Sequence, residues 1–337
     1  MSDTDENTEI VTIHDREFQK LSVDQKIYCV PVDEREEDRL ASQHELIFRL
    51  FGTLFIPRIS NPHKILDCGH GRGEWVVAVA EDYEECKVVG VDIWPELLSL
   101  NQPDNLALFG YNLNDRLNDL VVFGRRGYDL IHSRFVGPGI KANRWSSYVR
   151  DMKNLLKPGG WMQMMEYYPN IQSDNGRLSS ESSIRRWYEG YVYAMERANR
   201  KPRIAQELRP LMEAAGLRDI RDPVQASIGR DSVWMVGELL DSLAIWPFVE
   251  HLGWTAAQVE TLMQGVRAEL EDESLRLYIP VVRVILSILH VYLGAQHRCP
   301  RNVASHAELD EDDELTMHPK STLATVGHHS VHTDSHK

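Results

Sequence analysis

Short apolar runs alternate with amphipathic stretches along most of the chain. We predict buried strands at five apolar runs, residues 64–68, 87–93, 105–112, 128–134 and 161–168. The stretches at residues 74–83 and 144–160 repeat apolar positions at helical spacing, and Pro158 with two glycines stops the second one. Buried strands that alternate with helices are typical of an α/β fold, in which helices cover both faces of a parallel sheet.

The second half of the chain adds further helices and two more strands. Helical spacing recurs over residues 177–200, 205–217 and 231–272. Apolar runs predict a sixth strand at residues 218–228 and a seventh at residues 275–287. Ahead of the first strand, residues 33–58 place Leu40, His44 and Ile47 on one face of a helix. We therefore predict a seven-stranded, mostly parallel sheet with helical insertions.

Both ends of the chain are polar, and we predict that residues 1–24 and 298–337 are disordered. The C-terminal segment contains an acidic block and six of the chain's 14 histidines. Metal ligands need a folded frame, which such a tail lacks, so we predict no metal site. Residues 25–292 then form one domain, with insertions at about residues 177–200 and 231–272.

The composition excludes several classes of protein. The net charge is −14 and no basic stripe is present, which argues against nucleic-acid binding. We expect no membrane span, because no apolar run of about 18 residues is free of charge. The four cysteines are scattered without a C-x-x-C pair, as reduced thiols in the cytosol or nucleus are. We expect a cytoplasmic protein, with the nucleus as the alternative.

Three glycines at every second position separate the first strand from the helix that follows. Gly69, Gly71 and Gly73 stand where an open α/β sheet binds ligands, at the carboxyl end of a strand. Asp92 ends the second strand, and a carboxylate there can accept hydrogen bonds from both hydroxyls of a ribose. The order of strand, loop, helix, strand and acid predicts a cofactor that contains a nucleoside.

Two cofactor families use this layout, and a generic glycine turn is the plain alternative. The dinucleotide fingerprint G-x-G-x-x-G needs a glycine where this chain has Glu74, and a glutamate there would repel a pyrophosphate. The pattern D-x-G-x-G-x-G from Asp67 to Gly73 instead resembles motif I of class I methyltransferases. Their cofactor, S-adenosylmethionine (SAM), has no phosphate and carries a sulfonium, so an acidic loop suits it.

Further segments make the resemblance more specific. The stretch "PVDEREEDRLASQH", from Pro31 to His44, precedes motif I, and "IHSRFVGPGIKANRW", "LKPGGWMQMMEY" and "LGWTAAQVETLMQGVRAEL" follow it. Together they resemble the LaeA-like methyltransferases of filamentous fungi over roughly residues 25–290. The resemblance implies a Rossmann-like class I methyltransferase fold with an inserted helical lid, and a SAM-dependent enzyme of secondary metabolism.

The resemblance also assigns the cofactor-binding residues. The methionine end of SAM would lie at the glycine loop, the ribose at Asp92, and the adenine amino group at Asn112. The predicted cofactor-binding set is Asp67, Gly69, Gly71, Gly73, Asp92, Ile93, Asn112 and Leu113. The family loop is commonly G-T-G-T-G, whereas this one carries His70 and Arg72 between its glycines. Arg72 either points away from the ligand or reaches the SAM carboxylate.

The catalytic base has several candidates. An oxygen or nitrogen acceptor must lose a proton, whereas a thiol needs less help. The candidates are His132 in the fourth strand, His44 on the N-terminal helix and Glu166 at the end of the fifth strand, and each could instead be a packing or capping residue. The aromatic stretch "WYEGYVYAM", residues 187–195, lies on an insertion and either lines an apolar substrate pocket or belongs to the core.

Two functions fit these features best. The first is an enzyme that methylates a small fungal metabolite on sulfur, oxygen or nitrogen. The second is a regulator of secondary metabolism that acts through velvet-type protein partners, which the altered loop and the acidic tail favour. A protein arginine methyltransferase fits less well, because that class carries paired glutamates after the fourth strand and "HSRFVGPG" has no acid.

Overall fold

The computed structural model describes residues 9–94, 102–217, 224–227 and 230–287. Its strands are β1 (Ile10–Ile13), β2 (Arg16–Gln19), β3 (Lys64–Cys68), β4 (Lys87–Asp92), β5 (Leu106–Gly110), β6 (Tyr128–Arg134), β7 (Leu156–Tyr167), β8 (Gln172–Ser173), β9 (Val224–Ser227) and β10 (Leu277–Ser287). Its helices are α1 (Lys20–Asp24), α2 (Glu34–Phe51), α3 (Glu74–Asp82), α4 (Trp145–Leu155), α5 (Ser183–Arg197), α6 (Ile204–Ala214), α7 (Arg230–Leu252) and α8 (Ala256–Glu271), and a short 3₁₀ turn covers Glu273–Leu275.

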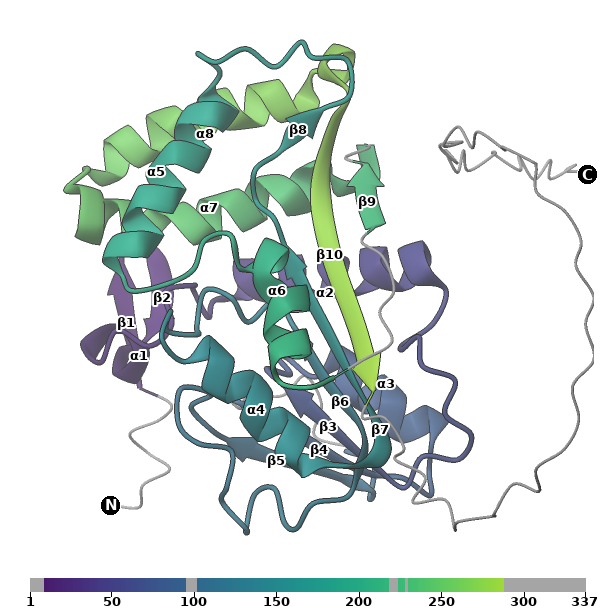
Figure 1. Cartoon of the computed structure of the whole chain (residues 1–337). Coiled ribbons are helices and arrows are strands. Elements are labelled where there is room, and N and C mark those ends of the chain that lie inside the picture. Colours follow the sequence, from purple (N-terminus) through teal and green to yellow (C-terminus); the bar gives the residue numbers. More distant parts are fainter. Residues whose placement is uncertain (1–8, 95–101, 218–223, 228–229, 288–337) are drawn as a thin grey trace, which may run out of the picture. The chain divides into compact units, whose positions relative to one another are not determined.

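The central sheet has the strand order β5-β4-β3-β6-β7-β10-β8, and β9 also pairs with β10 (Figure 1). The five strands from β5 to β7 run parallel, whereas β10 runs antiparallel to β7. The predicted mostly parallel, seven-stranded sheet is confirmed, and β3 and β6 begin and end at the predicted residues. The two residues of β8 add an eighth strand, which was not predicted because it contains no apolar run.

Helices cover both faces of this sheet, which explains why its central strands are almost continuously apolar. On one face, Ile65, Val88 and Leu130 pack in a cluster with Trp75 of α3. On the other face, which α4 and α6 cover (Figure 1), the next residue of each strand packs in a cluster with side chains of these two helices. The alternation of side chains along a strand therefore gives each face of the sheet its own apolar cluster.

Three inserted helices, α5, α7 and α8, pack against one another, and we call them the helical cap (Figure 1). Trp187 of α5 is fully buried, and its indole N–H donates to the carbonyl of Leu240 in α7 at 3.0 Å. The cap confirms the helical character predicted for residues 177–200 and 231–272. Tyr191, Leu239 and Leu243 of the cap line the cavity described below.

The central helix of the cap, α7, is apolar on nearly all sides, as a helix buried in a core is. By length and composition alone, Ser232–Leu252 could cross a membrane, but 83% of its most apolar 18-residue stretch is buried within the fold. Its Asp241 lies 3.1 Å from Arg35 and 3.3 Å from Arg16. Burial and ion pairing together describe α7 as a core helix.

The N-terminal segment, residues 10–33, is folded, and we call it the N-terminal arm. The predicted disorder of residues 1–24 is therefore wrong for residues 10–24, because β1 and β2 pair as a hairpin that leads into α1. Arg16 donates to Asp33 at 2.6 and 2.9 Å, and Arg200 donates to the carbonyls of Lys26 and Ile27 at 2.7 Å. These partners are distant in sequence, so composition alone could not reveal the fold of the arm.

α2 differs from its prediction in length and in the face that it buries. The predicted helix ran to residue 58, whereas Gly52, with φ of 66°, ends it in the left-handed conformation. Its buried residues are Glu36, Arg39, Gln43 and Ile47. Three of these four are polar, because this face of α2 lines the cavity.

Some predictions fall wholly or partly outside the described residues. The sixth strand is confirmed over Val224–Ser227 only, since residues 218–223 and 228–229 are not described. The C-terminal tail, including Cys299, lies outside the described residues as well. Cys29, Cys68 and Cys86 are free and buried, as predicted for reduced thiols.

Candidate active site

The glycine loop, residues 69–73, joins β3 to α3 at the carboxyl edge of the sheet. All three glycines have positive φ, between 58° and 98°. A Cβ on Gly69 would also lie 2.4 Å from Cγ1 of Val136, so no side chain fits there. Gly69 and Gly71 line a cavity, whereas Gly73 is buried at the start of α3 and lies outside its lining.

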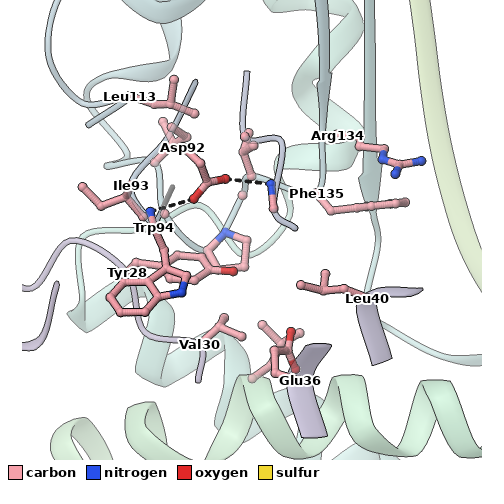
Figure 2. Close-up of a pocket in the computed structure, with 18 of the residues that line it drawn as sticks. Tyr28, Val30, Glu36, Leu40, Asp92, Ile93, Trp94, Leu113, Arg134 and Phe135 are labelled. Carbon is pink, nitrogen blue, oxygen red and sulfur yellow. Dashed lines mark hydrogen bonds between the residues drawn. The ribbon is translucent and has the colours of Figure 1, made fainter. Parts of the chain in front are cut away.

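Asp92, at the end of β4, lies on the wall of this cavity (Figure 2). Its Oδ1 accepts a hydrogen bond from the N–H of Trp94 and its Oδ2 from the N–H of Gly71, both at 2.9 Å. These two bonds hold the carboxylate at the edge of the sheet. Both oxygens keep a second lone pair that can accept a ribose hydroxyl, as the sequence predicts.

Ile93, Asn112 and Leu113 also line the cavity. The Oδ1 of Asn112 accepts from the backbone N–H and the side-chain amide of Asn114, both at 3.0 Å. Because a backbone N–H can only donate, the oxygen of Asn112 faces Asn114 and its NH₂ group is left for a ligand. Asn112 therefore presents donors to the cavity, which would suit a ring nitrogen of adenine rather than the adenine amino group.

Two carboxylates near the loop each have a buried oxygen without a hydrogen-bond partner, Asp67 Oδ1 and Glu74 Oε1. Burial raises the pKa of Asp67 to about 7, and Arg134 opposes that rise. Burial also raises the pKa of Glu74, which lines the cavity, whereas Asp67 lies beneath the loop outside the lining. Unsatisfied buried acceptors are costly, so a positively charged ligand group beside them would be favoured.

The two unusual side chains of the loop contact the protein. Nδ1 of His70 lies 2.7 Å from the carbonyl of Gly71, and its ring packs where a Cβ on Gly90 would come within 3.1 Å. Arg72 forms an ion pair at 3.0 Å with Glu37 of α2. Arg72 was predicted either to point away from the ligand or to reach the SAM carboxylate. In the structure its guanidinium is held by Glu37 of α2.

Neither predicted histidine base lines the cavity. His132 lies within β6, is 1% exposed and stacks on Trp75 with ring centroids 3.9 Å apart. Burial lowers its pKa well below the usual value. Nδ1 of His44 lies 3.0 Å from Nη2 of Arg134, and burial lowers the pKa of His44 to about 4. His132 is buried and His44 is partly buried, and both lie outside the cavity lining, so neither is placed to take a proton from a ligand within it.

Glu166, the third predicted candidate, does line the cavity. Its Oε1 accepts from the backbone N–H groups of Val136 at 2.9 Å and Gly137 at 3.1 Å. Burial raises the pKa of Glu166 to about 8, although the two N–H groups lower it. Among the described residues Oε2 has no hydrogen-bond partner, so this oxygen is left for a ligand.

The polar face of α2 contributes a network that sequence reasoning did not assign to the site. Glu36 accepts from Arg39 at 2.9 Å and from Ser242 of α7 at 2.6 Å. Gln43 accepts from Arg39 at 2.8 Å and from the hydroxyl of Tyr167 at 3.1 Å. The signal was present in the spacing of these polar residues, which follows one face of a helix.

Aromatic rings form much of the remaining wall. Phe135 and Tyr167 stack with centroids 4.1 Å apart, and Tyr28 and Tyr191 also line the cavity. Of the predicted aromatic stretch, residues 187–195, only Tyr191 lines the cavity. Trp187 stacks on Tyr191 and is buried in the core. Tyr28, Trp94 and Phe135 were not predicted, because the loops that carry them have no periodic pattern.

A glycine loop, an acid at the end of the next strand and a cavity that both of them line define the nucleoside-cofactor site of a class I methyltransferase. The methyltransferase domain family matches residues 37–221 of the chain. The secondary metabolism regulator LAE1 of Cochliobolus heterostrophus is 30% identical over 275 residues, which is 75% of this chain and 87% of that protein. The methyltransferase pytC of Aspergillus terreus is 30% identical over 72% of this chain and 77% of its own length.

Another relative is the secondary metabolism regulator laeA of Aspergillus fumigatus, 28% identical over 79% of this chain and 72% of that protein. A solved structure of a putative sarcosine dimethylglycine methyltransferase from Galdieria sulphuraria is 14% identical with a TM-score of 0.40, covering 77% of this chain and 92% of that chain. The chain belongs to the LaeA-like branch of the methyltransferase domain family. It is a SAM-dependent methyltransferase.

The residues of the cavity fit SAM on their own chemistry. Glu74 at the start of α3 would repel a pyrophosphate, whereas its unpartnered buried oxygen suits a cationic group. The positive φ of Gly69 and Gly71 opens the loop for close approach of a ligand. Asp92, Ile93, Asn112 and Leu113 would hold the adenosine, and the loop would hold the methionine.

Proposed function

We propose that this methyltransferase acts on a small, flat and largely apolar metabolite, which it methylates on oxygen, nitrogen or sulfur. The observation that supports this proposal most is the aromatic part of the cavity, which we call the acceptor half. The cavity wall carries the rings of Tyr28, Phe135, Tyr167 and Tyr191, and Tyr167 and Tyr191 interact electrostatically with the carboxyl group of Glu166. Aromatic walls with a few placed polar groups are typical of small-molecule sites.

When bound, SAM supplies a methyl group that is activated by the positive charge on its sulfur. The chain's own residues then have to orient the acceptor, exclude water and receive a proton from an oxygen or nitrogen acceptor. Glu166 can receive that proton in its ionised form, because Val136 and Gly137 fix one of its oxygens and leave the other for a ligand. With a pKa of about 8, a minority of the protein has this form at neutral pH. The N-terminal arm and the helical cap line the cavity and would shield a bound acceptor from water.

The test is to incubate purified protein with methyl-labelled SAM and an extract of its source organism. Label should enter the organic phase, and Asp92→Ala should abolish it because the ribose loses its acceptor. Asp104→Ala, a change of an exposed aspartate between β4 and β5, is the matched control and should keep the activity. Absence of labelled metabolite with the unchanged protein, when SAM binding is intact, would count against this function.

A second candidate is regulation of secondary metabolism through velvet-type protein partners, in the cytoplasm or in the nucleus. The names of LAE1 and laeA, which are regulators, favour it. Nuclear entry would depend on the partner, since the sequence has no basic import cluster. Co-purification of the full chain with velvet-type proteins at stoichiometric yield would support this candidate. A clean separation of the two on size-exclusion chromatography would remove it.

A further inference from the structure

Four cationic side chains line the cavity, and one of them differs from the other three. Arg39 pairs with Glu36 at 2.8 Å, Arg72 pairs with Glu37 at 3.0 Å, and Lys201 pairs with Glu207. Among the described residues, Arg134 is not within ion-pair distance of any carboxylate, and its polar contact is the neutral imidazole of His44 at 3.0 Å. A guanidinium group in a protein wall that lacks a direct ion pair is costly unless a ligand supplies a carboxylate.

The geometry points to Arg134 as the residue that binds the α-carboxylate of SAM, with His44 as the residue that positions its guanidinium group. This assignment rests on the SAM-binding site and is independent of the acceptor that the enzyme methylates. It also replaces Arg72, whose guanidinium is already held by Glu37 on α2.

The order of residues along the cavity supports the assignment. Figure 2 shows Ile93 and Leu113 on one side of Asp92 and Arg134 on the other side. The part of the glycine loop that donates to Asp92 lies between Asp92 and Arg134. In SAM the adenine and the amino acid lie at opposite ends of the ribose. If the adenine lies at Ile93 and Leu113, the amino acid extends toward Arg134.

The charges around Arg134 match both groups of an amino acid. Its own charge suits the carboxylate, while Asp67 and Glu74 interact electrostatically with it and each keep an unpartnered buried oxygen. Of these two oxygens, that of Glu74 lines the cavity and suits the α-ammonium group or the sulfonium, whereas Asp67 acts on the site only through its charge. A zwitterionic ligand thus supplies a partner for the cation and for the acids at once.

His44 can hold Arg134 only as an acceptor. An arginine nitrogen always carries hydrogen, so the 3.0 Å contact requires an unprotonated Nδ1 on His44. Burial and the neighbouring Arg134 lower the pKa of His44 to about 4, which keeps the ring neutral throughout the physiological range. The histidine at the end of the "PVDEREEDRLASQH" stretch therefore orients a cation without competing with it.

The experiment measures binding alone, by isothermal titration calorimetry, with SAM and with decarboxylated SAM. Decarboxylated SAM keeps the adenosine, the sulfonium and the ammonium group and lacks only the carboxylate. The unchanged protein should bind SAM about tenfold to a hundredfold more tightly than decarboxylated SAM, the range expected for a charge-assisted hydrogen bond. Arg134→Met should remove this preference and leave the affinity for decarboxylated SAM within about threefold.

Arg72→Met is the matched control, since it also removes an arginine from the cavity wall. It should change the affinities for both ligands by the same factor and leave their ratio unchanged. His44→Leu should reduce the ratio, and His44→Gln, which retains an acceptor, should restore part of it. Loss of the preference in Arg72→Met with retention in Arg134→Met would overturn the assignment.

The comparison of the two ligands on the unchanged protein needs no variant, so it stands even if Arg134→Met does not fold. Equal affinities there would also overturn the assignment of Arg134. Failure to bind either ligand would remove the SAM site itself. A preference for SAM in a protein that methylates no metabolite would leave Arg134 assigned and set aside only the proposed acceptor.

Discussion

At the scale of the residue, Glu166 is the titratable group whose environment has the clearest consequence. It is 4% exposed, and burial raises its pKa to about 8. The tyrosines that face it, Tyr167 and Tyr191, stay neutral because burial raises the pKa of each phenol as well. In the unfolded chain a glutamate titrates near pH 4.3. Between about pH 4.3 and pH 8 the folded state therefore holds a proton that the unfolded state has released.

The free energy of unfolding should consequently fall as the pH rises through this window, by at most about 1.4 kcal/mol per pH unit. Glu166→Gln carries a permanently neutral amide and should lose this slope. Urea denaturation gives the free energy of unfolding at pH 5.5 and at pH 7.5. Between these pH values the unchanged protein should lose about 1–3 kcal/mol more than Glu166→Gln does. Glu189→Gln, at an exposed position of α5, should show the same pH dependence of the free energy of unfolding as the unchanged protein. If Glu166→Gln showed the same pH dependence as the unchanged protein, the raised pKa of Glu166 would be contradicted.

Residue positions were predictable from sequence only where a strand end fixes them. Asp92 and the glycines lie at the edge of the sheet because β3 and β4 end there, and the apolar runs locate both ends. His132 shares a face of β6 with Arg134 but lies two residues deeper, about 7 Å, under Trp75 of α3. The sequence pattern gives the face of a strand, whereas the depth at which an α3 side chain covers it depends on tertiary packing.

At the scale of the element, the N-terminal arm depends on one buried guanidinium group. Arg16 is 5% exposed and joins β2 to Asp33, which caps α2, and to Asp241 in α7. The Arg16 guanidinium helps to hold the pKa of Asp33 below its usual value, although burial of the carboxyl opposes it. One side chain thus connects the hairpin, the cavity-lining helix and the helical cap.

Arg16→Met should lower the free energy of unfolding by about 3–5 kcal/mol, because two largely buried carboxylates lose a shared partner. Lys20→Met, on the same arm, removes an exposed pair with Glu9 and should cost less than about 1 kcal/mol. Guanidinium denaturation of the two variants makes the comparison. Equal losses would mean that the arm contributes little to the fold.

At the scale of the whole molecule, the parallel sheet was predictable because burial on both faces leaves a continuous apolar run at each strand. The arm and the polar face of α2 were not, since their polar residues are stabilised by partners more than 200 positions away, such as Asp241 for Arg16 and Ser242 for Glu36. Their sequences resemble solvated surface. The spacing of the polar residues on α2 shows that they share one face of a helix, but only the long-range partners show that this face is buried.

The arm also bears on how fragments of this protein behave. The family match begins at residue 37, inside α2, so a gene cut at that apparent boundary encodes a chain without Tyr28, Glu36 or Asp33. We expect such a fragment to retain the sheet, lose the cap on its first long helix and bind SAM at least tenfold more weakly than the full chain by calorimetry. Truncations designed from the family boundary would then suggest that the methyltransferase domain is inactive on its own. The loss of activity would instead come from the missing wall of the cavity.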